Sequence, residues 1–140
     1  MNEIIKNLYI SERRLAEELP EGEYKVLLIS LKSIKREHVR MAIDDCVLWP
    51  SETVEFVIDT ISSWLAEGER VCVACDGGVS RSAGAITAYL VSKEGMDLGD
   101  ALDLVKSKRN ITKPHPFIVE AIIKYLRQKQ KEDDWECKNV

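Results

Sequence analysis

Short apolar runs that alternate with segments of helical periodicity constrain the fold of this chain most strongly. Strands are predicted where β-branched or aromatic residues cluster between charged residues, Pro or Gly, over residues 8–10, 24–29, 39–43 and 71–74. Helices are predicted over residues 11–19, 33–38, 51–67, 82–93, 98–108 and 116–131. This alternation predicts an α/β fold, with a mostly parallel central sheet of four to five strands flanked by helices on both faces. Sheets of this kind carry their sites at the carboxyl ends of strands.

The size and charge of the chain limit what it can be. With 140 residues, 45% of them hydrophobic, it can bury one core. We expect one domain over residues 1–130 and a charged, solvated tail over residues 131–140. Twenty Lys and Arg against 24 Asp and Glu give a net charge of −4, which excludes the general attraction used by nonspecific nucleic-acid and membrane-surface binders. Any anion must therefore be held by a local site.

Cysteine and histidine are too few for a disulfide framework or a zinc site. The chain has two histidines, His38 and His115, which are expected to be structural or surface residues. Its four cysteines are Cys46, Cys72, Cys75 and Cys137. We therefore expect no metal and no organic cofactor. The absence of a long apolar run and of a secretory signal at the first residues predicts a soluble, cytoplasmic protein, expected to be a monomer.

The most informative segment is VCVACDGGVSRSAGAITAY, residues 71–89. It places a cysteine at a strand end, two glycines in the turn and an arginine where a helix begins. Residues 75–82, called the anion loop below, can direct consecutive backbone N–H groups into one concavity, next to the positive end of the helix dipole. The residues expected to bind a phosphate in this way are Asp76, Gly77, Gly78, Val79, Ser80 and Arg81. The planar guanidinium of Arg81 suits a tetrahedral oxyanion.

Cys75 distinguishes this loop from a nucleotide-binding loop, which would end in Gly-Lys-Ser or Gly-Lys-Thr. Amide donors and a guanidinium stabilise a thiolate, so the pKa of the Cys75 thiol is expected to fall and the sulfur to act as a nucleophile. When such a sulfur attacks a phosphate ester, the departing alkoxide or phenolate needs a proton, so an acid must lie nearby.

The string Cys-Asp-Gly-Gly-Val-Ser-Arg-Ser over residues 75–82 resembles the signature loop of the cysteine-dependent protein tyrosine phosphatases. Residues 79–83 and 88–90 are most similar to the dual-specificity branch. The resemblance implies that Cys75 takes the phosphoryl group, that Arg81 holds its oxygens and that Ser82 donates a hydrogen bond to the departing sulfur. It also implies a phosphoprotein substrate and a shallow site that accepts phosphotyrosine and phosphoserine or phosphothreonine.

In that family the acid is an aspartate on a loop upstream of the nucleophile, before the long helix. Asp44 and Asp45 occupy this interval. We expect Asp45 to be the acid, because it projects further beyond the preceding strand, with Asp44 as the alternative.

The chain departs from the family at Ala74, where a histidine usually stands. The resemblance implies that this histidine orders the loop and keeps the cysteine ionised, so its absence predicts a slower enzyme or a more alkaline activity profile. Two alternatives stay open. One is a phosphatase-derived module, weak or inactive in catalysis, that binds phosphoproteins. The other is a sulfur-transfer or arsenate-reducing enzyme, which the Arg-Ser ending and the upstream acid disfavour.

Four other residues have plainer interpretations. Cys72 is expected to pack in the core, and Cys46 to be an ordinary loop residue rather than a thiol that protects Cys75 from oxidation. Trp49 is expected to line the active-site cleft, to pack in the core or to be a surface aromatic residue. Arg109 is expected to cap the end of its helix.

Overall fold

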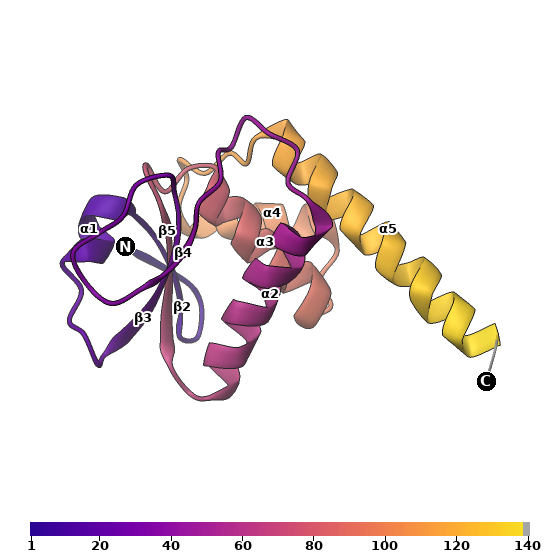
Figure 1. Cartoon of the computed structure of the whole chain (residues 1–140), viewed down its shortest axis with the longest axis horizontal. Coiled ribbons are helices and arrows are strands. Elements are labelled where there is room, and N and C mark those ends of the chain that lie inside the picture. Colours follow the sequence, from indigo (N-terminus) through magenta and orange to yellow (C-terminus); the bar gives the residue numbers. More distant parts are fainter. Residues whose placement is uncertain (139–140) are drawn as a thin grey trace.

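A five-stranded sheet forms the centre of the structure, a computed structural model that describes the backbone of residues 1–138 and the side chains of residues 1–135 (Figure 1). The strands span Asn2–Ile5 (β1), Leu8–Glu12 (β2), Tyr24–Ile29 (β3), Val39–Met41 (β4) and Arg70–Cys75 (β5). In the order β1-β2-β5-β3-β4, only the edge strand β1 runs antiparallel to its neighbour. The expected mostly parallel sheet is confirmed.

Strand β5 occupies the middle of the sheet, between β2 and β3. Its residues from Val71 to Cys75 are buried, as the continuous apolar run predicts. Cys75 pairs in register with Glu12 at the end of β2, and Ala74 with Leu28 near the end of β3. The carboxyl ends of three parallel strands therefore meet where the anion loop begins.

Helices cover both faces of the sheet, as expected, but unequally (Figure 1). Among the described helices, only the short helix α1 lies on one face, and the other four lie on the opposite face. The helices span Arg13–Glu17 (α1), Ser51–Ala66 (α2), Arg81–Lys93 (α3), Leu98–Lys108 (α4) and Pro116–Lys138 (α5). Under α1 lies a small apolar cluster, called the α1-side cluster below, made of Ala16, Val26, Leu28, Ile34, Cys72 and Ala74. The larger core lies under the other helices.

Helix α3 is the most deeply buried helix that the structure describes. Every residue from Arg81 to Leu90 is buried, with α2, α4 and α5 packed around it. Gly84 allows this close packing, because a Cβ there would collide with the side chain of Ile118 on α5. A helix enclosed in this way holds its first turn, and thus Arg81, in a fixed place relative to the sheet.

Several element predictions were wrong in detail. The helix predicted over residues 11–19 is shorter, because β2 continues to Glu12 and α1 spans only Arg13–Glu17. Residues 33–38 form no helix: the backbone N–H groups of Lys35 and Glu37 donate instead to the side chains of Glu17 and Glu21. Strand β4 ends at Met41 rather than at residue 43. Strand β1 was not predicted, since its polar Asn2 and Glu3 conceal the pairing with β2.

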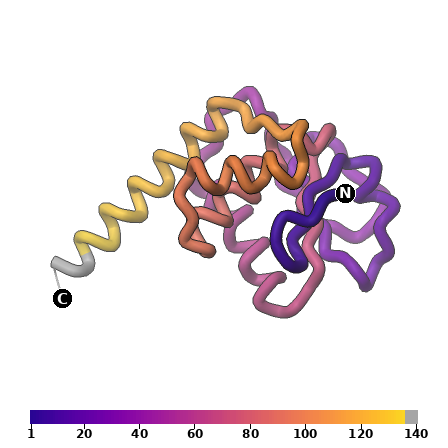
Figure 2. Tube along the Cα trace, turned by 180° about the vertical axis from the view of Figure 1, so that it is seen from behind, coloured from indigo at the N-terminus to yellow at the C-terminus, as the bar shows by residue number. Residues whose placement is uncertain are grey.

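Helix α5 is longer than predicted and leaves the body of the molecule (Figures 1 and 2). It continues to Lys138, past the end predicted at residue 131, and residues 131–135 are exposed. The side chain of Cys137 and residues 139–140 lie outside the described part of the chain, and the domain boundary at residue 130 stays a prediction. Among the described helices, none is both long and apolar enough to span a bilayer.

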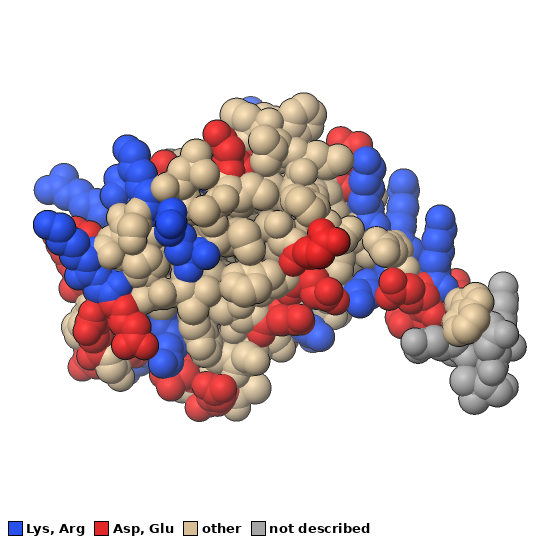
Figure 3. All heavy atoms as spheres, in the orientation of Figure 1, with Lys and Arg blue, Asp and Glu red and all other residues tan. Residues whose placement is uncertain are grey.

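Charged side chains of both signs are mixed over the face seen in Figure 3. Lys and Arg side chains gather at the end of the molecule that carries α1 and along α5, with acidic side chains among them. This mixture agrees with the small net charge of −4, and a phosphate would have to be held by groups placed close around it.

Candidate active site

Cys75 lies at the point where β5 turns into the anion loop. Its side chain is only 2% exposed, and its Sγ lies 3.1 Å from the hydroxyl oxygen of Ser82, in the first turn of α3. Strand and helix are both buried, so the sulfur and the hydroxyl are held together by two rigid elements. The structure thus joins Cys75 and Ser82 as the sequence predicts.

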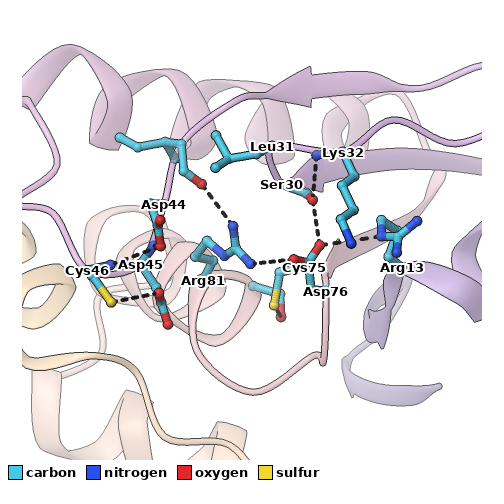
Figure 4. A network of polar contacts seen from close by, with 12 residues as sticks. Arg13, Ser30, Leu31, Lys32, Asp44, Asp45, Cys46, Cys75, Asp76 and Arg81 are labelled. Carbon is cyan, nitrogen blue, oxygen red and sulfur yellow. Dashed lines mark hydrogen bonds and ion pairs between the residues drawn. The ribbon is translucent and has the colours of Figure 1, made fainter.

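Arg81 is the first residue of α3, and its guanidinium is anchored at two points (Figure 4). Nη1 donates to the backbone oxygen of Ile43 at 3.0 Å, and Nη2 lies 3.1 Å from Oδ2 of Asp76. The Arg81 side chain is 11% exposed. A guanidinium that is buried and held in this way is pre-organised for an oxyanion.

The carbonyl groups of the anion loop are bonded on its outer side. Arg109 donates from Nε to the oxygen of Gly78 at 2.9 Å and from Nη2 to that of Gly77 at 3.4 Å, and the N–H of Lys113 donates to the oxygen of Val79 at 2.8 Å. In a trans peptide, N–H and C=O point in opposite directions. The N–H groups that follow these three carbonyls therefore face the concave side of the loop, as a phosphate site requires.

Ser80 and Gly78 complete the shape of the loop. Ser80 occupies the N-cap position of α3 but makes no capping bond within the described residues, since its hydroxyl accepts the backbone N–H of His115 at 2.8 Å. The first turn of α3 is thus left for an anion. Gly78 has a φ of +64°, a left-handed conformation that glycine adopts without strain.

Asp44 and Asp45 lie on the segment between β4 and α2, called the acid loop below (residues 43–49). The core anchors this loop through Trp49, which is 3% exposed and donates from Nε1 to the backbone oxygen of Asp44 at 3.0 Å. Of the three interpretations of Trp49, core packing is the observed one. Ile43, in the same loop, accepts the bond from Arg81, so the loop is also tied to the anion loop.

The two acidic side chains of the acid loop have different surroundings. Oδ1 of Asp44 accepts the backbone N–H of Asp45 at 2.7 Å and that of Cys46 at 3.3 Å. A hydrogen bond with the Asp45 side chain, followed by those two N–H groups, holds the pKa of Asp44 below its ordinary value. Asp45 is half-buried, and its Oδ1 accepts the thiol of Cys46 at 3.4 Å.

The three cysteines with described side chains are free. Cys72 packs in the α1-side cluster as predicted, and burial raises the pKa of its thiol to about 11. Cys46 is exposed on the acid loop. Asp44, Asp45 and Cys46 place three potential metal-ligand atoms within 4.8 Å of one another. The expectation that the reaction needs no metal can therefore be tested with a chelator such as EDTA.

Sequence reasoning missed three residues that shape the site. Arg109 does end α4, but its guanidinium bonds the anion loop rather than its own helix. Ser30, after β3, donates to Oδ1 of Asp76 at 2.5 Å, and Arg13 of α1 lies 3.4 Å from the same oxygen. No local pattern marks these residues, because each reaches the loop from a distant part of the sequence.

Known proteins share this arrangement of elements. The family model described as the dual specificity phosphatase catalytic domain matches residues 18–128. Dual specificity protein phosphatase MPK-4 of Drosophila melanogaster is 31% identical over 105 residues, which cover 75% of this chain and 24% of that protein. Human dual specificity protein phosphatase 1 is 33% identical over 108 residues, which cover 77% of this chain and 26% of that protein. The chain spans about a quarter of the length of these two relatives.

The fold agrees with this match. The crystal structure of a mouse putative dual specificity phosphatase complexed with zinc tungstate has a TM-score of 0.83 at 25% identity, and the alignment covers 94% of this chain and 89% of that one. The family model extends over well more than half of the chain and includes the whole anion loop with Cys75 and Arg81. The chain therefore belongs to the dual specificity phosphatases, a family of protein phosphatases within the cysteine-dependent protein tyrosine phosphatase superfamily.

Proposed function

We propose that this chain hydrolyses phosphate monoesters on proteins, both phosphotyrosine and phosphoserine or phosphothreonine, through a phosphocysteine intermediate. One observation carries the proposal: the buried Cys75 sulfur lies 3.1 Å from the Ser82 hydroxyl, in a loop whose outer carbonyls are already bonded. Inward N–H groups and the anchored Arg81 then surround a phosphoryl group.

In the first step the Cys75 thiolate attacks phosphorus, an S–P bond forms and the P–O bond to the leaving group breaks. Arg81 and the loop N–H groups hold the non-bridging oxygens, whose charge they stabilise. The acid of the acid loop gives its proton to the leaving oxygen, so that a neutral alcohol or phenol departs.

In the second step a water molecule attacks phosphorus and the S–P bond breaks, with the electron pair returning to sulfur. The carboxylate formed in the first step takes a proton from the water. The Ser82 hydroxyl, which lies next to Sγ, donates a hydrogen bond to the departing thiolate. Inorganic phosphate leaves, and the enzyme returns to its starting state.

We assign the acid to Asp45, with Asp44 as the alternative. A hydrogen bond with the Asp45 side chain and two backbone N–H groups hold the pKa of Asp44 below its ordinary value, which disfavours Asp44 as a proton donor. Asp45 is half-buried, and its carboxylate does not accept such a pair of backbone N–H groups within the described residues.

The experiment compares hydrolysis of p-nitrophenyl phosphate and phosphopeptides by the wild type and the variants Cys75→Ser, Asp45→Asn and Asp44→Asn. We expect turnover that vanadate inhibits and EDTA does not, and that Cys75→Ser abolishes. Asp45→Asn should lower kcat by about 10²–10⁴-fold for phosphopeptides, whose leaving groups need the proton. The same loss in Asp44→Asn alone would move the role to Asp44.

The rival is a phosphoprotein-binding module, favoured by Ala74 in place of the family's histidine. Tight phosphopeptide binding without turnover between about pH 5 and pH 9 would select it. Turnover that survives Cys75→Ser would defeat both functions. The cytoplasmic location and the monomeric state stay predictions.

A further inference from the structure

Asp76 places a carboxylate inside a loop that is built for an anion. Oδ1 accepts the hydroxyl of Ser30 at 2.5 Å, and Oδ2 lies 3.1 Å from Nη2 of Arg81 (Figure 4). Oδ1 also lies 3.4 Å from Nε of Arg13, a contact between charges without hydrogen-bond geometry. The Asp76 side chain is 44% exposed, yet both of its oxygens are engaged.

Ser30 gives Asp76 a rigid support. It is fully buried at the end of β3, and its Oγ accepts the backbone N–H of Lys32 at 3.0 Å. That bond uses the oxygen as acceptor and leaves the hydroxyl proton for Asp76. Partial burial alone would raise the pKa of Asp76, but the Ser30 hydroxyl, the charge and hydrogen bond of Arg81 and the charge of Arg13 together lower it. Asp76 is therefore ionised over the working range of a phosphatase.

The contact with Asp76 leaves N–H donors of the Arg81 guanidinium available for a substrate. A guanidinium carries five N–H donors, and the bonds to Ile43 and Asp76 use one each on Nη1 and Nη2. Within the described residues, three donors, including Nε–H, remain for phosphate oxygens. The two anchors fix the guanidinium from both sides, one on the acid loop and one on the anion loop.

We propose that Asp76 is a positioning residue, which holds the Arg81 guanidinium in the orientation that the phosphoryl transition state needs and is itself supported by Ser30. This rests on the proposed function and deepens it. The charge of Asp76 costs little repulsion toward a phosphate dianion, because the Arg13 guanidinium offsets it at 3.4 Å. In the opposing model, the Asp76 carboxylate only repels an anionic substrate, and its removal would help that substrate bind.

The test compares Asp76→Asn, Ser30→Ala and the double variant with Glu12→Gln as the matched control. Glu12 is exposed and pairs in register with Cys75, so Glu12→Gln removes one negative charge beside the loop without touching Arg81. The readouts are kcat and KM for p-nitrophenyl phosphate, inhibition by vanadate as a transition-state mimic and by inorganic phosphate as a ground-state mimic, and thermal unfolding.

We expect Asp76→Asn, which removes a charged hydrogen bond to Arg81, to lower kcat by about 10–100-fold, equivalent to about 1.4–2.7 kcal/mol, and to weaken vanadate binding by a similar factor. KM and phosphate inhibition should change by less than about threefold, because they report ground-state binding. Ser30→Ala should lower kcat less, and the double variant should be no slower than Asp76→Asn, since Ser30 acts through Asp76.

The proposal is overturned if Asp76→Asn keeps kcat and lowers KM, or if Glu12→Gln lowers kcat as much. It is also overturned if the losses of Ser30→Ala and Asp76→Asn simply add. Should the wild type show no turnover, the proposed function fails, but vanadate binding measured by calorimetry still decides the role of Asp76. A weaker vanadate complex in Asp76→Asn supports the positioning role, and an equal or tighter one defeats it.

Discussion

Gly78→Ala should damage the anion loop from its outer side. A Cβ at Gly78 would lie 2.8 Å from Nη2 of Arg109 and 2.9 Å from both the carbonyl carbon and the oxygen of Ser11. Ser11 belongs to β2 and cannot withdraw, so the loop or Arg109 must move. The left-handed backbone, with φ at +64°, costs an alanine about 1–2 kcal/mol, and a displaced Arg109 loses a charged hydrogen bond worth about 1.5–3 kcal/mol. The expected loss of unfolding free energy is about 2.5–5 kcal/mol.

Gly68→Ala is the matched control for the backbone term. Gly68 has a φ of +79°, and nothing lies within 4 Å of a Cβ added there, so the variant carries only the conformational cost of about 1–2 kcal/mol. Urea unfolding measures both variants, and hydrolysis of p-nitrophenyl phosphate reports the loop. We expect Gly78→Ala to be the less stable variant by about 1.5–3 kcal/mol and to lose nearly all turnover, while Gly68→Ala keeps its kcat. Equal stability losses with turnover retained in Gly78→Ala would refute the collision argument.

Three further predictions test the supports of the site. Arg109→Met removes the bonds to Gly77 and Gly78 and should lower kcat by about tenfold or more, with Arg109→Lys intermediate in the same assay. Cys72, with a pKa of about 11 and no exposure, should escape iodoacetamide in the folded protein and react only in denaturant, as peptide mass spectrometry can show. The lowered pKa of Asp76 stabilises the fold above the carboxyl's unfolded pKa, and this contribution is lost as pH falls through the folded pKa; urea unfolding should therefore show less acid sensitivity in Asp76→Asn than in the wild type.

The centre of the site could be predicted from sequence because it is local. Cys75, Arg81 and Ser82 lie within one strand–turn–helix segment, and the glycines between them predict a turn. A continuous apolar run likewise placed β5 in the middle of a parallel sheet. Neighbours in sequence are neighbours in space here, so the chemistry of the loop follows from the order of its residues.

The supports of the site could not be predicted, because they depend on how distant elements meet. Arg109 resembles an ordinary helix-ending cation until the packing of α4 brings it to the loop carbonyls. Asp76 looks like an ordinary turn residue in the sequence, and only the fold shows that Ser30, after β3, and Arg13 of α1 contact its carboxylate. The start of α1 could not be predicted either, because the pairing of β2 with β5 keeps Ser11 and Glu12 in the strand, whereas the local sequence predicts a helix from residue 11.

The last prediction concerns Ala74→His, which restores the family's histidine at a position whose surroundings leave no room for an imidazole. Its side chain is fully buried in the α1-side cluster, among apolar neighbours that include Ala16, Val26 and Cys72. An imidazole there would overpack the layer beneath α1 by several heavy atoms, at a cost of about 1–3 kcal/mol, and would bury a polar ring among apolar side chains. We therefore expect Ala74→His to unfold at a lower temperature than the wild type without a gain in kcat, as calorimetry and a pH-rate profile would show. A stable and faster Ala74→His would instead mean that the missing imidazole limits turnover and that Asp76 and Arg109 order the anion loop less well than their contacts indicate.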